Sequence, residues 1–202
     1  MMVGLSLWAA TAGGSDLPRP YQEALVALRT SKDPSVRALA AIALAHGFGD
    51  VPLPDPPEVV DALSDAMHGD ADPTVQAMTA YALSVLRDPR GVPRLISAVQ
   101  STAARGVDPQ GPYSDAVRLP VPYLYRALGH AGGREATAFL IETARTGPSR
   151  ARVVAIAALG LVLDDDGEVE RALTTLSADA DSTVRNAARY VMSERKPRSG
   201  KR

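Results

Sequence analysis

Residues 33–44, DPSVRALAAIAL, constrain the fold of this chain more than any other segment. An Asp-Pro pair favours a helix start, Val-Arg follows it, and alanines then recur at helical spacing. When Leu44 is taken as a register mark, related segments of the chain place Leu83, Leu128, Leu159 and Met192 at the same mark. Self-similarity at a period of about 20 to 50 residues indicates a solenoid, in which each unit buries its apolar face against its neighbours.

A second apolar segment with helical spacing precedes each register mark. The last of them reads GEVERALTTLSA and places its Val and Leu residues on one helix face. Each unit is therefore predicted to be a helix, a short turn and a second helix. Asp33, Asp72 and Asp181 are expected to cap the second helix of their units, and prolines follow the first two of them.

The sequence predicts an all-α fold, a right-handed α-α superhelix of about five helical pairs. A single solenoid is expected over residues 1–195. Its units are predicted at residues 20–47, 57–87, 90–132, 133–163 and 166–195. The polar, basic residues 196–202 are expected to form a disordered tail.

The apolar N-terminus, MMVGLSLWAATAGG, admits three interpretations. The favoured one is a helix over residues 1–14 that closes the first layer of the solenoid, because an apolar run into Gly13-Gly14 resembles the run into Gly132-Gly133. A signal peptide is the second, with Ala10-Thr11-Ala12 as its cleavage site, although a basic n-region is missing. The third is an apolar surface for self-association or partner binding. We expect a cytoplasmic protein, or an exported one if the second interpretation holds.

Three turn segments carry a resemblance to a known family. They are Asp33-Pro34 with Val36-Arg37, Asp72-Pro73 with Val75, and Asp181 with Val184-Arg185, each followed by an Ala-Leu run or its equivalent. Over roughly residues 20–195 the chain resembles the HEAT-repeat family, in particular its short bacterial variety.

The resemblance implies a structural ladder between repeats. In HEAT-like repeats such arginines pair with the turn aspartate of a neighbouring repeat, which sets register and binds no ligand. The ladder residues it implies are Asp33, Arg37, Asp72, Arg152, Asp181 and Arg185. The chain departs from the family pattern at Gln76, where Arg is expected, and in the third unit, which lacks the Asp-Val-Arg element.

The third unit contains a long insertion, residues 104–119, where neighbouring units have short turns. Loops of this length are often functional, although a tolerated surface insertion also accounts for it. Aromatic and basic residues gather in and after the loop, and Tyr and Arg are enriched at binding hot spots. The predicted partner-binding residues are Tyr81, Tyr113, Tyr123, Tyr125, Arg126, His130 and Tyr190. The alternative is that these rings pack in the core.

Neither composition nor motifs point to chemistry at a catalytic site. The chain has 202 residues, 46% of them hydrophobic, and a formal net charge of −1, which suits one globular unit. It has no Cys, which excludes disulfides, thiolate zinc sites and Cys nucleophiles. His46, His68 and His130 are all expected at helix C-termini, where the macrodipole favours them. We therefore predict no enzyme activity, no cofactor and no metal site.

The predicted function is a scaffold or adaptor that binds another protein on the concave face or through the 104–119 loop. An alternative is a lyase or chaperone-type subunit that acts on a tetrapyrrole-carrying protein, because the repeats are similar to those of bilin-lyase-type HEAT proteins. Nucleic-acid binding is a further alternative, and the acidic balance of the chain without its basic tail disfavours it.

Overall fold

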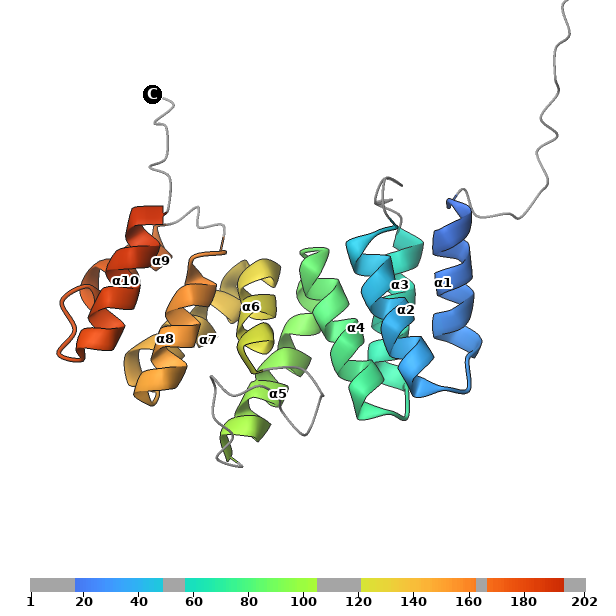
Figure 1. Ribbon diagram of the computed structural model, residues 1–202, viewed down its shortest axis with the longest axis horizontal. Coiled ribbons are helices and arrows are strands. Elements are labelled where there is room, and N and C mark those ends of the chain that lie inside the picture. The colour runs from blue at the N-terminus through green and yellow to red at the C-terminus, as the bar shows by residue number, and fades with distance from the viewer. Residues whose placement is uncertain (1–16, 49–56, 105–120, 163–166, 195–202) are drawn as a thin grey trace, which may run out of the picture.

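The computed structural model describes residues 17–48, 57–104, 121–162 and 167–194. These residues form an all-α solenoid of five helical pairs, as the sequence predicted (Figure 1). The predicted closing helix at 1–14, the inserted loop beyond residue 104 and the tail at 196–202 lie outside the described residues.

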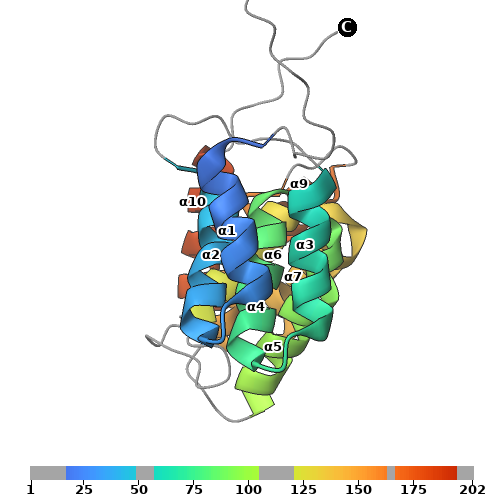
Figure 2. The same cartoon turned by 90° about the vertical axis from the view of Figure 1, so that its right-hand side faces the viewer.

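Each pair consists of an odd-numbered and an even-numbered helix. The described helices are α1 (Arg19–Thr30), α2 (Pro34–His46), α3 (Pro57–Gly69), α4 (Pro73–Val85), the 3₁₀ helix η1 (Pro89–Gly91), α5 (Val92–Ala104), α6 (Val121–Ala131), α7 (Gly133–Thr146), α8 (Ser149–Leu159), α9 (Glu168–Leu176) and α10 (Ser182–Glu194). Figure 2 looks along the row and shows α2 and α10 on one side, with α3 and α9 on the other.

The two layers differ in how tightly they are packed. Each even-numbered helix contacts the next one extensively, from α2 to α10, whereas successive odd-numbered helices touch far less. When neighbouring helices are closer together in one layer than in the other, the stack curves so that the more closely spaced layer lies on the inside. The even layer therefore forms the inner side of the curve.

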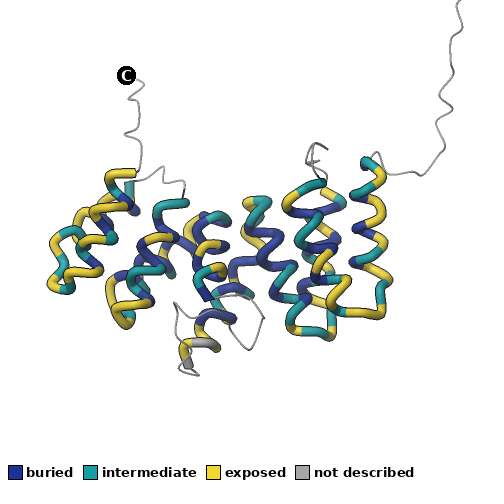
Figure 3. The backbone as a smooth tube through the Cα atoms, viewed as in Figure 1, coloured by how far each residue is buried: buried dark blue, intermediate teal, exposed yellow. Residues whose placement is uncertain are grey.

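Small side chains permit the close stacking of the even layer. Alanines are buried in every even-numbered helix, for example Ala41 in α2, Ala80 in α4 and Ala155 in α8. Register-mark leucines fill the space between the layers, and the buried residues run through the whole row (Figure 3). The leucines at this mark, Leu44, Leu83, Leu128 and Leu159, are fully buried.

The turns within the pairs behave as their sequences predicted. Asp33, Asp72 and Asp181 each accept a hydrogen bond from the backbone N–H two residues later, at 2.7 to 2.8 Å. A side-chain oxygen at this place satisfies an N–H group that the helix leaves without a partner. Helix α6 begins at Val121 and has Pro122 as its second residue, a first-turn position where the missing N–H of proline costs no helical hydrogen bond.

Helices α6 and α8 of the even layer approach each other closely at Gly129. A Cβ added at Gly129 would lie 2.4 Å from the carbonyl oxygen of Ala158. The neighbouring atom is backbone, so a methyl group at Gly129 can only be accommodated if the two helices move apart. A Cβ added at Gly91 of η1 would similarly lie 2.5 Å from the carbonyl oxygen of Ala80.

We predict that Gly129→Ala destabilises the fold. Forcing a methyl group into a packed contact costs about 1–3 kcal/mol, which exceeds the helix-propensity gain of about 0.5–1 kcal/mol from replacing Gly by Ala. Thermal unfolding followed by circular dichroism measures the difference. Gly69→Ala, at the end of α3, is the control, because an added Cβ there meets nothing within 4 Å. Equal melting temperatures for the two variants would contradict the close approach of α6 and α8.

Candidate functional site

One repeated stripe of side chains on the even-numbered helices is exposed or partly exposed, apart from the buried Tyr81. It occupies positions five and two residues before the register mark and two residues after it, which share one face of a helix. We call this surface the even-helix face. Its residues are Leu39, Ile42, His46, Met78, Tyr81, Val85, Tyr123, Arg126, His130, Val154, Ala157, Leu161, Ala187, Tyr190 and Glu194.

The even-helix face exposes large apolar side chains in register. Leu39 is 69% exposed and Tyr123 is 47% exposed, and both stand five residues before their marks. Met78 and Val154 hold the same position in α4 and α8 and are partly exposed. Tyr190, at the far end in α10, is 66% exposed. Exposed apolar residues are ordinary when scattered, but here they follow one line from helix to helix.

Charge divides the two layers of helices. Glu194 is the one carboxylate in the five even-numbered helices of the described chain, and α4 contains no charged residue. The odd-numbered helices carry Glu23, Glu58, Asp61, Asp65, Glu135, Glu142, Glu168 and Glu170 together with arginines. The even-helix face is consequently apolar with isolated cations, while the odd layer has a mixed, solvated surface.

The cations of this face gather near its middle. Arg126 Nε donates to His130 Nε2 at 3.3 Å, and Arg87 Nη1 lies 3.5 Å from the carbonyl oxygen of His130. Burial lowers the pKa of His130, and the positive charges of Arg126 and Arg87 lower it further. Arg126 has no carboxylate partner among the described residues. We call Arg87, Arg126 and His130 the Arg126 cluster.

A groove lies beside the Arg126 cluster, between α6 and α8. Its volume is about 440 Å³, and it is lined by Pro122, Arg126, Val153, Val154, Ala157, Ala158 and Leu161. The lining is apolar except for the guanidinium of Arg126. A second hollow, between α1 and α3, is lined by Arg37 and Asp70, whose charges already pair with each other.

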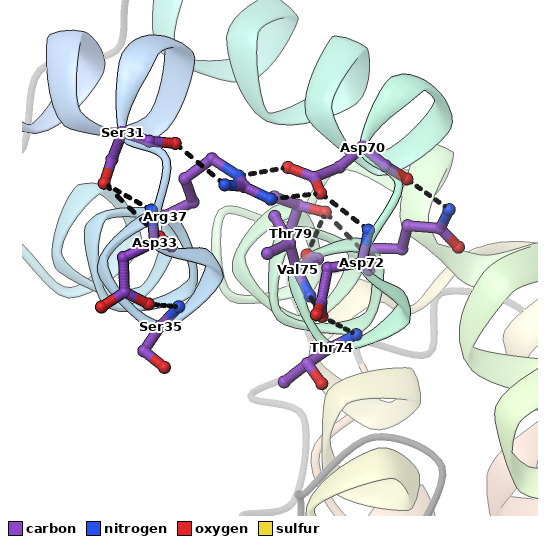
Figure 4. A network of polar contacts seen from close by, with 10 residues as sticks. Ser31, Asp33, Ser35, Arg37, Asp70, Asp72, Thr74, Val75 and Thr79 are labelled. Atoms are coloured by element: carbon purple, nitrogen blue, oxygen red, sulfur yellow. Dashed lines mark hydrogen bonds and ion pairs between the residues drawn. The ribbon is translucent and has the colours of Figure 1, made fainter.

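The arginines of the implied ladder lie at the opposite end of the helices, by the turns. Arg37 binds Asp70 of the next unit through two hydrogen bonds, Nε to Oδ2 at 2.6 Å and Nη2 to Oδ1 at 2.8 Å (Figure 4). At the other end of the stack, Arg152 of the fourth unit forms an ion pair with Asp179 of the fifth unit. The hydrogen bonds from these arginines hold the pKa of Asp70 and of Asp179 below the usual range.

The pairing carboxylates differ from those that the resemblance implied. Asp72 and Asp181 cap their helices, and the cross-repeat partner is the aspartate two residues earlier in each turn. Asp33 likewise caps its helix and receives no bond from a neighbouring arginine among the described contacts. Arg185 bonds to the carbonyl oxygen of Asp179 at 2.6 Å, within its own turn. Gln76 makes the equivalent bond, to the carbonyl oxygen of Asp70.

The predicted partner-binding residues divide into three groups. Tyr123, Arg126 and Tyr190 are exposed on the even-helix face, and His130 is partly exposed there. Tyr125 is 3% exposed and Tyr81 is 9% exposed, so neither is the exposed contact residue that the sequence suggested.

Tyr125 faces the neighbouring helices, and burial raises its pKa. The ring of Tyr81 lies 6.1 Å from that of His46. Tyr113 lies outside the described residues. Leu39, Met78 and Val154 were not predicted from the sequence as surface contact residues, although their common distance from the register mark could have revealed them.

The described residues contain neither a metal-binding cluster of side chains nor a membrane-spanning helix. Three or more His, Asp or Glu side chains do not gather at metal-binding distance anywhere in this part of the chain. None of the helices described here has the length and apolar character needed to cross a membrane.

We predict that Asp70→Asn lowers stability by about 1–2 kcal/mol at neutral pH. The pair with Arg37 is 16% and 8% exposed on its two side chains, which places it between shielded charged hydrogen bonds of about 1.5–3 kcal/mol and surface pairs of about 0–1 kcal/mol. Asp61→Asn is the control, because Asp61 pairs with Arg90 at an exposed site. Urea unfolding at several pH values measures both.

The pH dependence follows from the lowered pKa of Asp70. A carboxyl whose pKa is lower in the folded protein stabilises it above the unfolded pKa of about 3.9. That contribution disappears as the pH falls through the folded value. The difference in the free energy of unfolding between the native chain and Asp70→Asn should therefore be largest at neutral pH and vanish in acid. A difference that persists below about pH 2 would show that the effect does not depend on the ion pair.

Comparison with known proteins agrees with this architecture. The family model described as HEAT repeats matches residues 22–108, from α1 to the end of α5 and just beyond. No curated protein matches the chain. HEAT repeats commonly mediate protein–protein interaction, and the fold is typically a non-enzymatic scaffold. The family match over residues 22–108 and the five stacked helical pairs confirm the resemblance to the HEAT-repeat family seen in the sequence.

Proposed function

We propose that this chain is a scaffold that holds a partner protein on the even-helix face. The observation that carries the proposal is the line of exposed apolar side chains, above all Leu39 and Tyr123, at one position of successive even-numbered helices. Soluble proteins rarely expose a contiguous apolar surface, and such surfaces often mark protein-binding sites.

The shape and residue types of the face support the same proposal. Solenoids bind partners along extended concave surfaces, and the even layer lies on the inner side of the curve. Tyr and Arg dominate binding hot spots, and Tyr123, Arg126 and Tyr190 are all exposed on this face. The 104–119 loop stays a second proposed contact, because α6, which follows it, carries Tyr123 and Arg126.

The test compares the native chain with a double variant, Leu39→Asp with Tyr123→Asp. Each protein is immobilised, exposed to nuclease-treated extract of the source cells, and its bound proteins are identified by mass spectrometry and measured by titration. We expect the double variant to bind the captured partner at least about tenfold more weakly, because two hot-spot contacts are replaced by charges. Circular dichroism verifies that both proteins are folded.

Val26→Asp is the matched control. Val26 is 59% exposed on α1, in the odd layer, so this variant replaces an exposed apolar residue by one aspartate on the other side. It should bind like the native chain. A third protein, with residues 104–119 replaced by a short Gly-Ser turn, tests the loop. A partner that binds the double variant as tightly as the native chain would refute the even-helix face as the binding site, and a folded native chain that captures nothing would count against the scaffold.

A further inference from the structure

The Arg126 cluster is the one concentration of positive charge on an otherwise apolar part of the described surface. We propose that the even-helix face recognises an acidic, apolar segment of a partner protein, with a carboxylate at Arg126 and an adjacent apolar side chain in the groove between α6 and α8. This inference rests on the proposed function and names the chemistry of the partner.

The first argument is that the charges of the cluster are uncompensated. Arg126 and Arg87 both lie against His130, and His46 adds to the same positive field. Some arginines of the described chain have carboxylate partners, as Arg37 has Asp70 and Arg90 has Asp61 and Asp88, whereas none is recorded for Arg126 or Arg87. Arg126 donates through Nε to a neutral ring nitrogen, so its guanidinium keeps further N–H donors for a planar, bidentate acceptor such as a carboxylate.

The second argument is the absence of repulsion. A partner carboxylate that approaches the face meets no acidic side chain of α2, α4, α6 or α8. Like charges placed opposite each other at an interface disfavour binding, so the part of the face formed by these four helices, which has no carboxylate, admits an acidic segment. The absence of acidic side chains from α2, α4, α6 and α8 is therefore part of the proposed selectivity for an acidic partner segment.

The third argument is the groove beside Arg126. It is lined by Pro122, Val153, Val154 and Leu161 among others, and Arg126 is its one charged lining residue. A volume of about 440 Å³ lies in the range of ordinary ligand pockets. A leucine- or phenylalanine-like side chain can enter the groove while the neighbouring carboxylate meets Arg126. This arrangement fits the apolar line that continues to Tyr123 and Leu39.

A protein segment fits this face better than a nucleic acid. Binding to a phosphate backbone gains strength from each phosphate that a cation neutralises along a track. On the even-helix face the residues of α2 and α4 are apolar apart from His46, so a strand of phosphates would meet one cationic spot between apolar stretches.

The test selects ligands without assuming a sequence. A phage-displayed library of random peptides of about 16 residues is selected on the full native chain. We expect the enriched peptides to carry Asp or Glu flanked by apolar residues. Replacing the acid of the best peptide with Lys should weaken its binding, measured by fluorescence anisotropy, by about tenfold or more.

Charge reversal on the protein then locates the contact. Arg126→Glu should bind the acidic peptide about tenfold or more weakly and should prefer its Lys twin. Arg145→Glu, an exposed arginine of α7 in the odd layer, makes the same change in net charge and should leave both affinities unaltered. Rescue by the Lys twin cannot arise from a variant that fails to fold, so it distinguishes contact from damage.

The other outcomes separate this inference from the proposed function. Enriched peptides that lose binding with Leu39→Asp and Tyr123→Asp but bind Arg126→Glu as before would overturn the acidic segment and leave the scaffold. Peptides indifferent to all three substitutions, or no enriched peptides at all, would count against both. Salt-sensitive binding of single-stranded DNA of about 20 nucleotides that Arg126→Glu abolishes, with no peptide binding, would assign the cluster to nucleic acid instead.

Discussion

The close stacking of the even-numbered helices is the constraint on which the other features of this solenoid depend. Backbones approach within contact distance only where side chains are small, as Gly129 does against Ala158. The residue after each register mark is accordingly Ala45, Ser84, Gly129, Gly160 or Ser193. Side chains that point toward the neighbouring helices are fixed by packing, and the stripe that points to solvent is the part of each even-numbered helix left free to vary. The exposed apolar line and the Arg126 cluster both lie on that stripe.

At the turns, successive units are joined by arginine–aspartate ion pairs. The residues that form these pairs change in the middle of the row. Arg37 and Arg152 each join two successive units through Asp70 and Asp179. The junction from the second to the third unit has Gln76 in place of the arginine, and Gln76 bonds within its own turn. Arg90 bridges this junction instead, with Asp61 of α3 and Asp88 before η1. The ladder is interrupted at the unit that holds both the long insertion and the Arg126 cluster, which is where the regular repeat gives way to a specialised one.

Much of the fold was predictable because it depends on local chemistry. Helical spacing located the pairs, and the aspartates that begin the second helices are caps in the structure. The ladder partners were not predictable from a single sequence, because the turns with Asp70 and Asp72 and with Asp179 and Asp181 each contain two aspartates. Only geometry shows that the helix N-terminus occupies the second one. Tyr125 was misjudged for a related reason: one position along a helix turns a side chain by about 100°, which is the difference between Arg126 in solvent and Tyr125 in the core. Leu39 was missed because an aliphatic residue in an Ala-rich helix is ordinarily assigned to the core.

The asymmetry of charge between the layers was present in the sequence, but its meaning depends on knowing which helices share a face. Carboxylates that seem evenly spread along the chain fall almost wholly on the odd layer and the turns. A mixed charged surface keeps one side of a thin solenoid soluble, and the other side can then expose apolar residues without general self-association. Burial and the charges of Arg126 and Arg87 lower the pKa of His130, and an acidic neighbour would oppose the effect of those charges. A cluster of cations without a carboxylate is the kind of feature expected where the compensating charge arrives with a partner.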